Sequence, residues 1–342
     1  MECTTIGVDL AKSVFEVAVS KRPGHVSERR RLSRDRFVRF FAERQPATVL
    51  LEACGSAHYW ARRLEGMGHS VKLLPPHLVR PYVQRNKTDR SDAKALLEAY
   101  RNEEIRPVPV KSVDQHTLAA LHRLRSGWMT TRTARINSLR GILREFGIVI
   151  PLGPRHVLRT VGALLEDADS GIPDALRPAL AAAASEVREL EARILTVERQ
   201  LRALARQTPT VERLMTIPGV GLLTATTLVA FVGDVRRFPS GRHFASYLGL
   251  TPREHSSGSV RRLGRISKRG DAYLRMLLIH GARAVLWAAQ QKTHPGRLQA
   301  WALGVALLRG RNRAAVALAN KLARIAWAVW KTDRSFEQRQ AA

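Results

Sequence analysis

Four acidic residues stand at positions that suit metal-dependent chemistry. Asp9 and Glu52 each follow a short apolar stretch that is typical of a buried strand. Asp89 and Asp92 stand three residues apart at the start of a predicted helix, which places both carboxylates on one helix face. If the two strands are neighbours and the helix packs across them, the four carboxylates converge. Carboxylates that converge repel one another unless a divalent cation neutralises them, and Mg²⁺ (or Mn²⁺) with oxygen ligands can organise phosphodiester chemistry.

The helical pair also has an ordinary structural explanation. Asp89 can cap the helix, and Asp92 can interact with the helix dipole in the first turn. An acid directly after a buried strand is harder to explain in this way, because burying an unpaired charge is costly. We therefore predict that Asp9, Glu52, Asp89 and Asp92 are catalytic metal ligands.

A second candidate site is the stretch Leu248–Ser259, in which three serines lie among glycines and cations. Such a stretch is typical of a flexible phosphate-binding loop. Alternatively, one serine is a nucleophile on phosphorus, activated by a base or a metal, with cations stabilising the charge that develops. Spacing alone does not separate Ser256, Ser257 and Ser259. The basic residues that we predict to contact nucleic acid here are Arg253, Arg261, Arg262, Arg265, Lys268 and Arg269.

The stretch Ile217–Gly221 has the form of a helix-hairpin-helix turn. Gly219 and Gly221 permit close approach of the backbone, and the helix that follows presents N–H groups to a phosphate. An ordinary tight connection between two helices is the alternative. Because the surroundings are basic, we predict that both glycines contact nucleic acid.

The elements that must position these residues fall into three predicted domains, at 1–108, 109–207 and 208–342. The first reads as α/β, and short links between its first three strands suggest an antiparallel meander. Its strands are predicted at 5–8, 14–19, 29–33, 49–51 and 71–74, and its helices at 36–43, 58–67 and 91–101.

The second domain is predicted to be helical, and the third mostly helical. Leu176–Leu204 carries apolar residues at alternating spacings of four and three, which is the pattern of a coiled coil. Its partner is either the preceding helix or a second subunit. Trp287, Trp301, Trp327 and Trp330 follow helical patterns in the third domain, and we interpret them as core residues.

The charge of the chain points to a polyanionic partner. Lys and Arg number 57 against 29 Asp and Glu in 342 residues, which gives a net charge of +28. A pI of about 11.5 is typical of proteins that bind nucleic acid. The excess is steepest after Glu254, where Asp271 is the only acid before Asp333. No apolar run is long enough to span a membrane, and two cysteines without a CxxC pattern suggest a reducing cytoplasm.

Together these motifs resemble the DEDD transposases of the IS110 insertion-sequence family. These transposases are relatives of the Piv DNA invertases, and they are also described as RNA-guided bridge recombinases. The resemblance covers nearly the whole chain. The segments that carry it are GVDLAKSVFEV, LEACGSAHYWA, NKTDRSDAKAL, TIPGVGLLTA, ASYLGLTPREHSSG and GRISKRGD. The HSSG form is similar to that of the IS1111 subgroup.

The resemblance implies a RuvC-like, RNase H-type first domain whose four acids are Asp9, Glu52, Asp89 and Asp92. It also implies that Ser257, which precedes a glycine, forms a covalent phosphoserine with DNA. The acids and the serine are then contributed by different subunits of a homodimer or homotetramer, with Leu176–Leu204 as a subunit contact. A noncoding guide RNA is expected to pair with donor and target DNA.

The function predicted from the sequence is that of a Mg²⁺-dependent, RNA-guided serine transposase or recombinase. One alternative is a metal-only nuclease or junction resolvase, with water as the nucleophile. The other is a nucleic-acid-binding protein without catalysis. Arg132, Arg135 and Arg140 of the helical segment are predicted to be available to an RNA duplex read by its shape and backbone.

Overall fold

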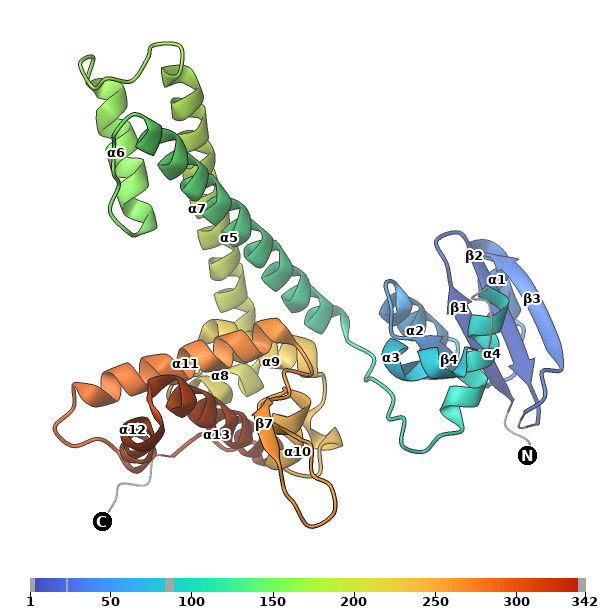
Figure 1. Cartoon of the computed structure of the whole chain (residues 1–342). Helices are drawn as coiled ribbons and strands as arrows, with labels where there is room; N and C mark the ends of the chain where they lie inside the picture. The colour runs from blue at the N-terminus through green and yellow to red at the C-terminus, as the bar shows by residue number, and fades with distance from the viewer. Residues whose placement is uncertain (1–3, 23, 84–88, 338–342) are drawn as a thin grey trace. The chain divides into compact units, whose positions relative to one another are not determined.

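The computed structural model describes residues 4–22, 24–83 and 89–337. The chain forms two compact units, of which the first ends at Val113 and the second begins at Asp114. Figure 1 draws the first unit in blue and cyan and the second from green to red. The boundary between the second and third predicted domains, at 207, lies inside the second unit and stays a prediction.

A five-stranded sheet in the order β3-β2-β1-β4-β5 organises the first unit. The first three strands form an antiparallel meander, and β4 and β5 continue the sheet in parallel with β1. The predicted meander is therefore confirmed, and so is the adjacency of the strands that carry Asp9 and Glu52. The strands are β1 (Thr5–Leu10), β2 (Val14–Ser20), β3 (Glu28–Ser33), β4 (Thr48–Glu52) and β5 (Ser70–Leu74).

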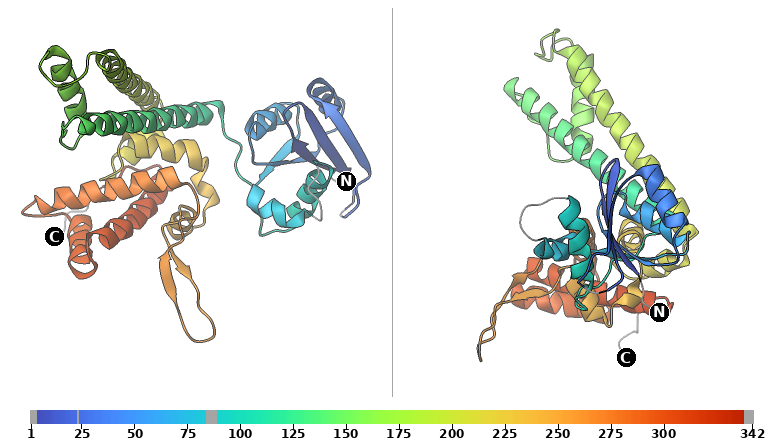
Figure 2. Two further views of the ribbon diagram at one scale, coloured as in Figure 1. Left: turned by 45° about the horizontal axis from the view of Figure 1, so that its top comes forward. Right: turned by 90° about the vertical axis from the view of Figure 1, so that its right-hand side faces the viewer.

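Helices cover both faces of this sheet (Figure 2). Alternate residues such as Ile6 and Val8 pack against α1 (Arg34–Ala42) and α2 (Ala57–Glu65). The other set of alternate residues faces the opposite side of the sheet, where Leu50 of β4 packs against α4 (Asp89–Tyr100). The central strands β1 and β4 are thus buried on both faces. The short helices α3 (Pro76–Val79) and η1 (Arg80–Tyr82), which precede α4, were not predicted.

Two long helices, α5 (Val113–Glu145) and α7 (Arg177–Arg206), open the second unit together with α6 (Pro154–Glu166). Three Arg–Glu pairs join α5 to α7, and their residue numbers rise along α5 as they fall along α7, so the two helices are antiparallel (Figure 1). The pairs are Arg125–Glu198 at 2.7 Å, Arg132–Glu191 at 3.5 Å and Arg135–Glu186 at 2.6 Å.

The apolar seam of α7 is buried within the chain. Val197 and Leu201 pack in one cluster with Leu118 of α5, and Val187 packs in another with Leu139 of α5. Of the two predicted partners, the preceding helix is therefore the one that the structure shows. The apolar seam is therefore covered by residues of the same chain, and a subunit contact at this segment stays a prediction.

The prediction that three arginines of α5 are available to an RNA duplex is wrong. Arg132 and Arg135 pair with glutamates of α7, and Arg140 donates to the carbonyls of Pro151 and Gly153. These guanidinium groups hold α5 to neighbouring segments. The sequence could not show this, because the glutamates that bind Arg132 and Arg135 lie more than fifty residues away.

The rest of the second unit is a helical body around one large core. Its last helix packs against α8, α10, α11 and α12. An exposed β-hairpin projects from this body (Figure 2). The elements are α8 (Pro209–Met215), α9 (Leu222–Val232), η2 (Val235–Arg237), α10 (Gly241–Tyr247), β6 (Pro252–Glu254), β7 (Leu263–Ile266), α11 (Ala272–Gln290), α12 (Arg297–Arg309) and α13 (Arg311–Thr332). Among the described residues, no helix is both long and apolar enough to cross a membrane.

A buried histidine joins α5 to this body. His122 is 1% exposed, and its Nε2 lies 2.9 Å from the Thr226 hydroxyl. The Thr226 hydroxyl donates its proton to the carbonyl of Leu222, so it accepts a hydrogen bond from Nε2–H of His122. Burial, and after it the charge of Arg125, lowers the pKa of His122 to about 4.

The depressed pKa of His122 predicts a loss of stability in acid. The unfolded chain, with a histidine pKa of about 6.5, binds the proton first, so the free energy of unfolding falls as the pH drops from about 6.5 to about 4. We expect His122 to contribute a loss of about 2 kcal/mol between pH 7 and pH 4.5. Denaturant unfolding at both pH values measures it, and His122→Gln should lack this part of the pH dependence. Equal losses in the two proteins would contradict the assignment.

Candidate active site

Asp9 and Glu52 lie side by side at the carboxyl ends of two neighbouring parallel strands. Asp9 is the fifth residue of β1, and Glu52 is the last residue of β4. Val8 is paired with Leu51, so one further step along both strands reaches the two acids. Because side chains alternate along a strand, both carboxylates share the sheet face of Leu50, which α4 covers.

The thiol of Cys54 lies close enough to both carboxylates to be affected by their charges. Burial raises the pKa of the Cys54 thiol first, and the negative charges of Glu52 and then Asp9 raise it further. A tight turn after β4, in which the Cys54 N–H donates to the Glu52 carbonyl at 2.7 Å, brings this thiol back towards the site. Sequence reasoning missed Cys54 as a neighbour of the two acids, because the turn after β4 decides where its thiol lies.

Helix α4 starts directly against β1, next to Asp9. A Cβ atom built on Gly7 would lie 2.3 Å from the Ala93 carbonyl oxygen, so only glycine permits this approach. Ala93 follows Asp92, which is half-buried in the same first turn. The side chain of Asp89 lies outside the described residues. Gly7 and Asp9 share a sheet face, and the close contact therefore brings the acidic end of α4 to the edge that carries Asp9 and Glu52.

The donor chemistry of these acids fits a hard divalent cation. All four predicted ligands offer carboxylate oxygens, which Mg²⁺ and Mn²⁺ prefer over softer ligands. Among the side chains that the structure describes, which exclude Asp89, no group of three or more His, Cys, Asp or Glu is arranged to hold a metal ion. The fit therefore rests on the oxygen donors and on the common edge of Asp9, Glu52 and the start of α4.

A further acid, Glu16, stands beside Asp9 and was missed in the sequence. The two residues are directly paired across β1 and β2, and they share a sheet face. Glu16 pairs with Arg31 of β3 at 3.5 Å, so its charge already has a partner. The sequence signal for Glu16 was its position between the apolar residues Phe15 and Val17. Side chains alternate along a strand, so Glu16 points to the opposite sheet face from these two residues.

Gly7→Ala is expected to damage both stability and activity. The new methyl group would meet the Ala93 carbonyl and push α4 away from β1, at a cost of about 1–3 kcal/mol, as for overpacked cores. DNA cleavage should fall as well, because Asp92 moves with α4. Urea denaturation and a cleavage assay measure the two effects. Gly141→Ala is the control, since nothing lies within 4 Å of its Cβ position and alanine should leave α5 equally or more stable.

The predicted serine loop is a β-hairpin, built on β6 and β7. The N–H of Ser257 donates to the Val260 carbonyl at 3.2 Å, and the Val260 N–H donates back at 3.1 Å. Gly258 takes the first position of the two-residue turn with a φ of +56°, which favours glycine. The exposed Ser257 thus stands beside the hairpin tip, where its backbone pairs with that of Val260.

Two glycines hold the base of the hairpin against the body. A Cβ on Gly249 would lie 2.0 Å from the Arg269 carbonyl oxygen, and one on Gly270 would lie 2.1 Å from that of Tyr247. Both have a positive φ. The segment that enters the hairpin after α10 therefore touches, backbone to backbone, the segment that leaves it before α11. This contact anchors the hairpin that carries the serines.

The structure separates the adjacent serines. The Ser256 hydroxyl donates to Glu254 Oε1 at 2.7 Å and accepts the Arg262 N–H at 3.2 Å. This bond to Ser256, and next the charge of Arg261, lowers the pKa of Glu254 against the opposing effect of desolvation. Ser257 is the next residue along the chain and pairs with Val260 through backbone groups. Glu254 is a carboxylate that sequence reasoning did not connect with either serine.

The predicted basic residues divide between several surroundings. Arg253 donates to the Ser267 carbonyl, and Arg261 pairs with Glu254 at 3.3 Å. Arg253 and Arg269 line a hollow of about 470 Å³ beside His255. Arg265 and Lys268 line a different and larger groove.

The glycines of the predicted hairpin turn between α8 and α9 have different surroundings. Gly219 has a φ of +82°, and a Cβ on Gly281 of α11 would lie 1.9 Å from the Gly219 carbonyl oxygen. Close packing of this turn on α11 is therefore a structural reason for Gly219. Gly221 precedes α9, is exposed and has nothing within 4 Å of its Cβ position. Contact of either glycine with nucleic acid stays a prediction.

Comparison with known proteins agrees with this arrangement of segments. A family model described as "Transposase IS116/IS110/IS902 family" matches residues 211–295, which include the serine hairpin. A second model, described as "Transposase" and of the DEDD type, matches residues 6–148, which include all four acids.

Full-length relatives carry related names. The chain is 44% identical over 337 residues to a "Probable family 20 transposase" of Pseudomonas aeruginosa, covering 98% of this chain and 99% of that protein. It is 39% identical to the "Transposase for insertion sequence element IS1111A" of Coxiella burnetii, covering 97% and 90%. A "Pilin gene-inverting protein" of Moraxella bovis is 27% identical and covers 85% and 82%. The chain therefore belongs to the IS116/IS110/IS902 family of insertion-sequence transposases, and it is an enzyme that acts on DNA.

Proposed function

We propose that this transposase cuts and rejoins DNA strands through a divalent metal held by Asp9, Glu52, Asp89 and Asp92 and through Ser257 as nucleophile. The observation that carries the proposal is the placement of Asp9 and Glu52 on adjacent parallel strand ends beneath the start of α4. A sheet of this order with carboxylates at that edge supports a RuvC-like, RNase H-type unit. The exposed serine hairpin supplies the second component.

Each part of the chain has a distinct task in this mechanism. Bound Mg²⁺ or Mn²⁺ supplies Lewis-acid stabilisation of charge on the scissile phosphate. Asp9 and Glu52, on rigid strands, keep their oxygens at the sheet edge, and α4 holds Asp92 beside them. Arginines of the hairpin neutralise phosphate oxygens as charge develops.

The Ser257 oxygen forms a bond to phosphorus while the bond from phosphorus to one deoxyribose oxygen breaks. The serine proton leaves, and the departing oxygen takes up a proton. A phosphodiester-type linkage is thus conserved in a covalent phosphoserine, and attack by the hydroxyl of another strand reverses the step and rejoins DNA. Such an exchange consumes no energy cofactor, which suits transposition and inversion alike, the activities named for relatives.

The acids belong to the first unit and the serine to the second. We include in the proposal that different copies of a homodimer or homotetramer supply the two parts. A noncoding RNA selects donor and target DNA at the nucleoid, and the charge of +28 supports two nucleic-acid partners at once.

Metal removal tests the proposal. Purified protein with its co-purified RNA is incubated with supercoiled plasmids that carry the ends of the element and a target. Strand cleavage and exchange are expected with Mg²⁺ or Mn²⁺ and should disappear with EDTA, then return when excess Mg²⁺ is added. Exchange that persists in EDTA would show that the acids serve another purpose. Cleavage without a covalent adduct would favour a metal-only nuclease with water as nucleophile.

A further inference from the structure

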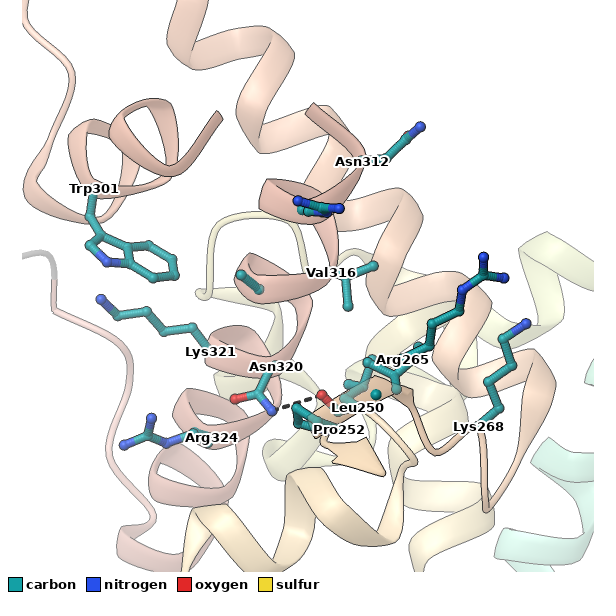
Figure 3. Close-up of a pocket in the computed structure, with 14 residues that line it drawn as sticks. Leu250, Pro252, Arg265, Lys268, Trp301, Asn312, Val316, Asn320, Lys321 and Arg324 are labelled. Carbon is teal, nitrogen blue, oxygen red and sulfur yellow. Dashed lines mark hydrogen bonds between the residues drawn. The ribbon is translucent and has the colours of Figure 1, made fainter. Parts of the chain in front are cut away.

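A large basic groove lies between the hairpin and the last two helices (Figure 3). Its volume is about 1600 Å³, which exceeds the roughly 300–1,000 Å³ of ordinary small-molecule pockets. β7 and the loop after it form one wall, and α12 and α13 form the others. The charged and aromatic residues that line it are Arg265, Lys268, Arg313, Lys321, Arg324 and Trp301.

The charge in this groove is of one sign. Five cationic side chains line it, and its lining residues include no carboxylate. Burial lowers the pKa of Lys321 first, and the charges of Arg324 and then Arg297 lower it further. Cations that repel one another in this way are stabilised by an anion with several charges, such as a chain of phosphates.

Trp301 adds a flat apolar surface to the groove, and the prediction that Trp301 and Trp287 are core residues is wrong. The Trp301 side chain is 38% exposed, and the Lys321 ammonium lies 4.0 Å from the centre of its ring. Figure 3 shows the lysine extending beneath the indole. Lys321 thus contacts one face of the ring, and an exposed indole among cations is the usual platform on which a nucleic-acid base stacks.

We propose that this groove binds a single-stranded segment of nucleic acid, with phosphates on its cations and one base stacked on Trp301. A duplex is a poorer fit, since its bases are already stacked on one another and present only their edges. Single strands arise both in exchanged DNA and in RNA loops. Both kinds of strand offer phosphates to the cations of the groove and bases to Trp301. The inference rests on the proposed function only in so far as the protein handles nucleic acid.

Photocrosslinking tests the stacking contact directly. Full-length protein is irradiated with oligo(dT) or oligo(U) that carries 5-bromo- or 5-iodouracil, and tryptic peptides are identified by mass spectrometry. We expect adducts on peptide 298–309, at Trp301. Trp287 is the internal control, because it is 68% exposed but lies outside the groove, in peptide 284–292. Adducts on both peptides in proportion to exposure would overturn the proposal.

Binding measurements then test the two kinds of contact separately. Trp301→Ala should weaken binding of the oligonucleotide at least about fivefold while leaving the salt dependence unchanged. Lys321→Gln should lower the slope of log K against log salt by about 0.7, which is the value for one phosphate contact on a single strand. Trp287→Ala and Lys292→Gln, outside the groove, are the matched controls and should match the wild type.

The oligonucleotide arms separate the remaining outcomes. Tighter binding of oligo(dT) identifies an exchanged DNA strand as the occupant, and tighter binding of oligo(U) identifies RNA. The proposal would be overturned if Trp301→Ala weakened binding of a blunt DNA duplex as much as binding of the oligonucleotide. It would also be overturned if the Trp301→Ala protein had wild-type thermal stability and bound the oligonucleotide as tightly as the wild type. The same assays on Ser257→Ala report on the groove alone, so a failed serine mechanism and a failed groove are distinguishable.

Discussion

Ser257→Ala is expected to abolish the covalent protein–DNA adduct and to lower strand exchange by about 10⁴-fold or more, as removal of a catalytic nucleophile does in other enzymes. The hydroxyl is the atom that bonds to phosphorus, and alanine leaves nothing to replace it. The hairpin should keep its shape, because Ser257 pairs with Val260 through backbone groups that alanine retains. Denaturing gels of protein trapped on labelled, cleaved DNA measure the adduct.

Ser256→Ala is the matched control for this prediction. Ser256 neighbours Ser257 and is equally exposed in the hairpin, but its hydroxyl already bonds with Glu254 and the Arg262 N–H. We expect Ser256→Ala to retain the adduct and to slow exchange less than tenfold, a loss of about 1 kcal/mol that is comparable with one hydrogen bond. DNA affinity should be equal in both variants, so that chemistry alone separates them.

The opposite pattern would move the nucleophile to Ser256. Loss of the adduct in Ser256→Ala but not in Ser257→Ala would make Glu254 the adjacent base, since its carboxylate lies 2.7 Å from the Ser256 hydroxyl. Glu254→Gln should then also lose the adduct. Normal exchange in both serine variants would sink the serine mechanism as a whole.

Asp9→Asn is expected to lower metal-dependent cleavage by about 10³-fold or more, because an amide of equal size removes one negative charge from the cation site. DNA binding should be unchanged or slightly tighter, since the variant carries one more net positive charge. Cleavage is measured across Mg²⁺ and Mn²⁺ concentrations, with binding followed separately by fluorescence anisotropy.

Glu16→Gln provides the control for Asp9→Asn on the same sheet face. Glu16 is directly paired with Asp9, but its carboxylate interacts with Arg31. We expect less than a tenfold change in cleavage. Equal damage by both substitutions would extend the acidic site to Glu16, and full activity of Asp9→Asn would leave the protein as a nucleic-acid binder whose acids are structural.

Local patterns were sufficient for the first unit. All five strands of the first unit were predicted from short segments of the sequence, and the acids after two of them predicted a common edge. The acids could be recognised because burying a charged residue next to an apolar strand is costly. Such a residue is therefore more often explained by a function than by the fold. The close approach of α4 to β1 could not be predicted from the sequence. It depends on the absence of a side chain at Gly7, where the Ala93 carbonyl, more than eighty residues away in the chain, packs against the strand.

The second unit shows where local pattern fails. The heptad of α7 predicted a buried seam but could not choose α5 as its partner. The charges of Arg132 and Arg135 suggested RNA, whereas in the structure both arginines pair with glutamates of α7. The hairpin escaped prediction because its strands are short, exposed and poor in apolar residues, so no buried face leaves a periodic pattern.

Periodicity in a sequence records which side of an element avoids water, and the types of exceptional residues record the chemistry that they can do. In this protein that information was enough for the α/β unit and the long helices, and it is the basis for predicting the metal-binding acids and a polyanionic partner. Which distant segment covers each apolar face is set by contacts that no single segment encodes. Those contacts buried the α7 seam, separated Ser256 from Ser257 and left Trp301 open in a groove of five cations.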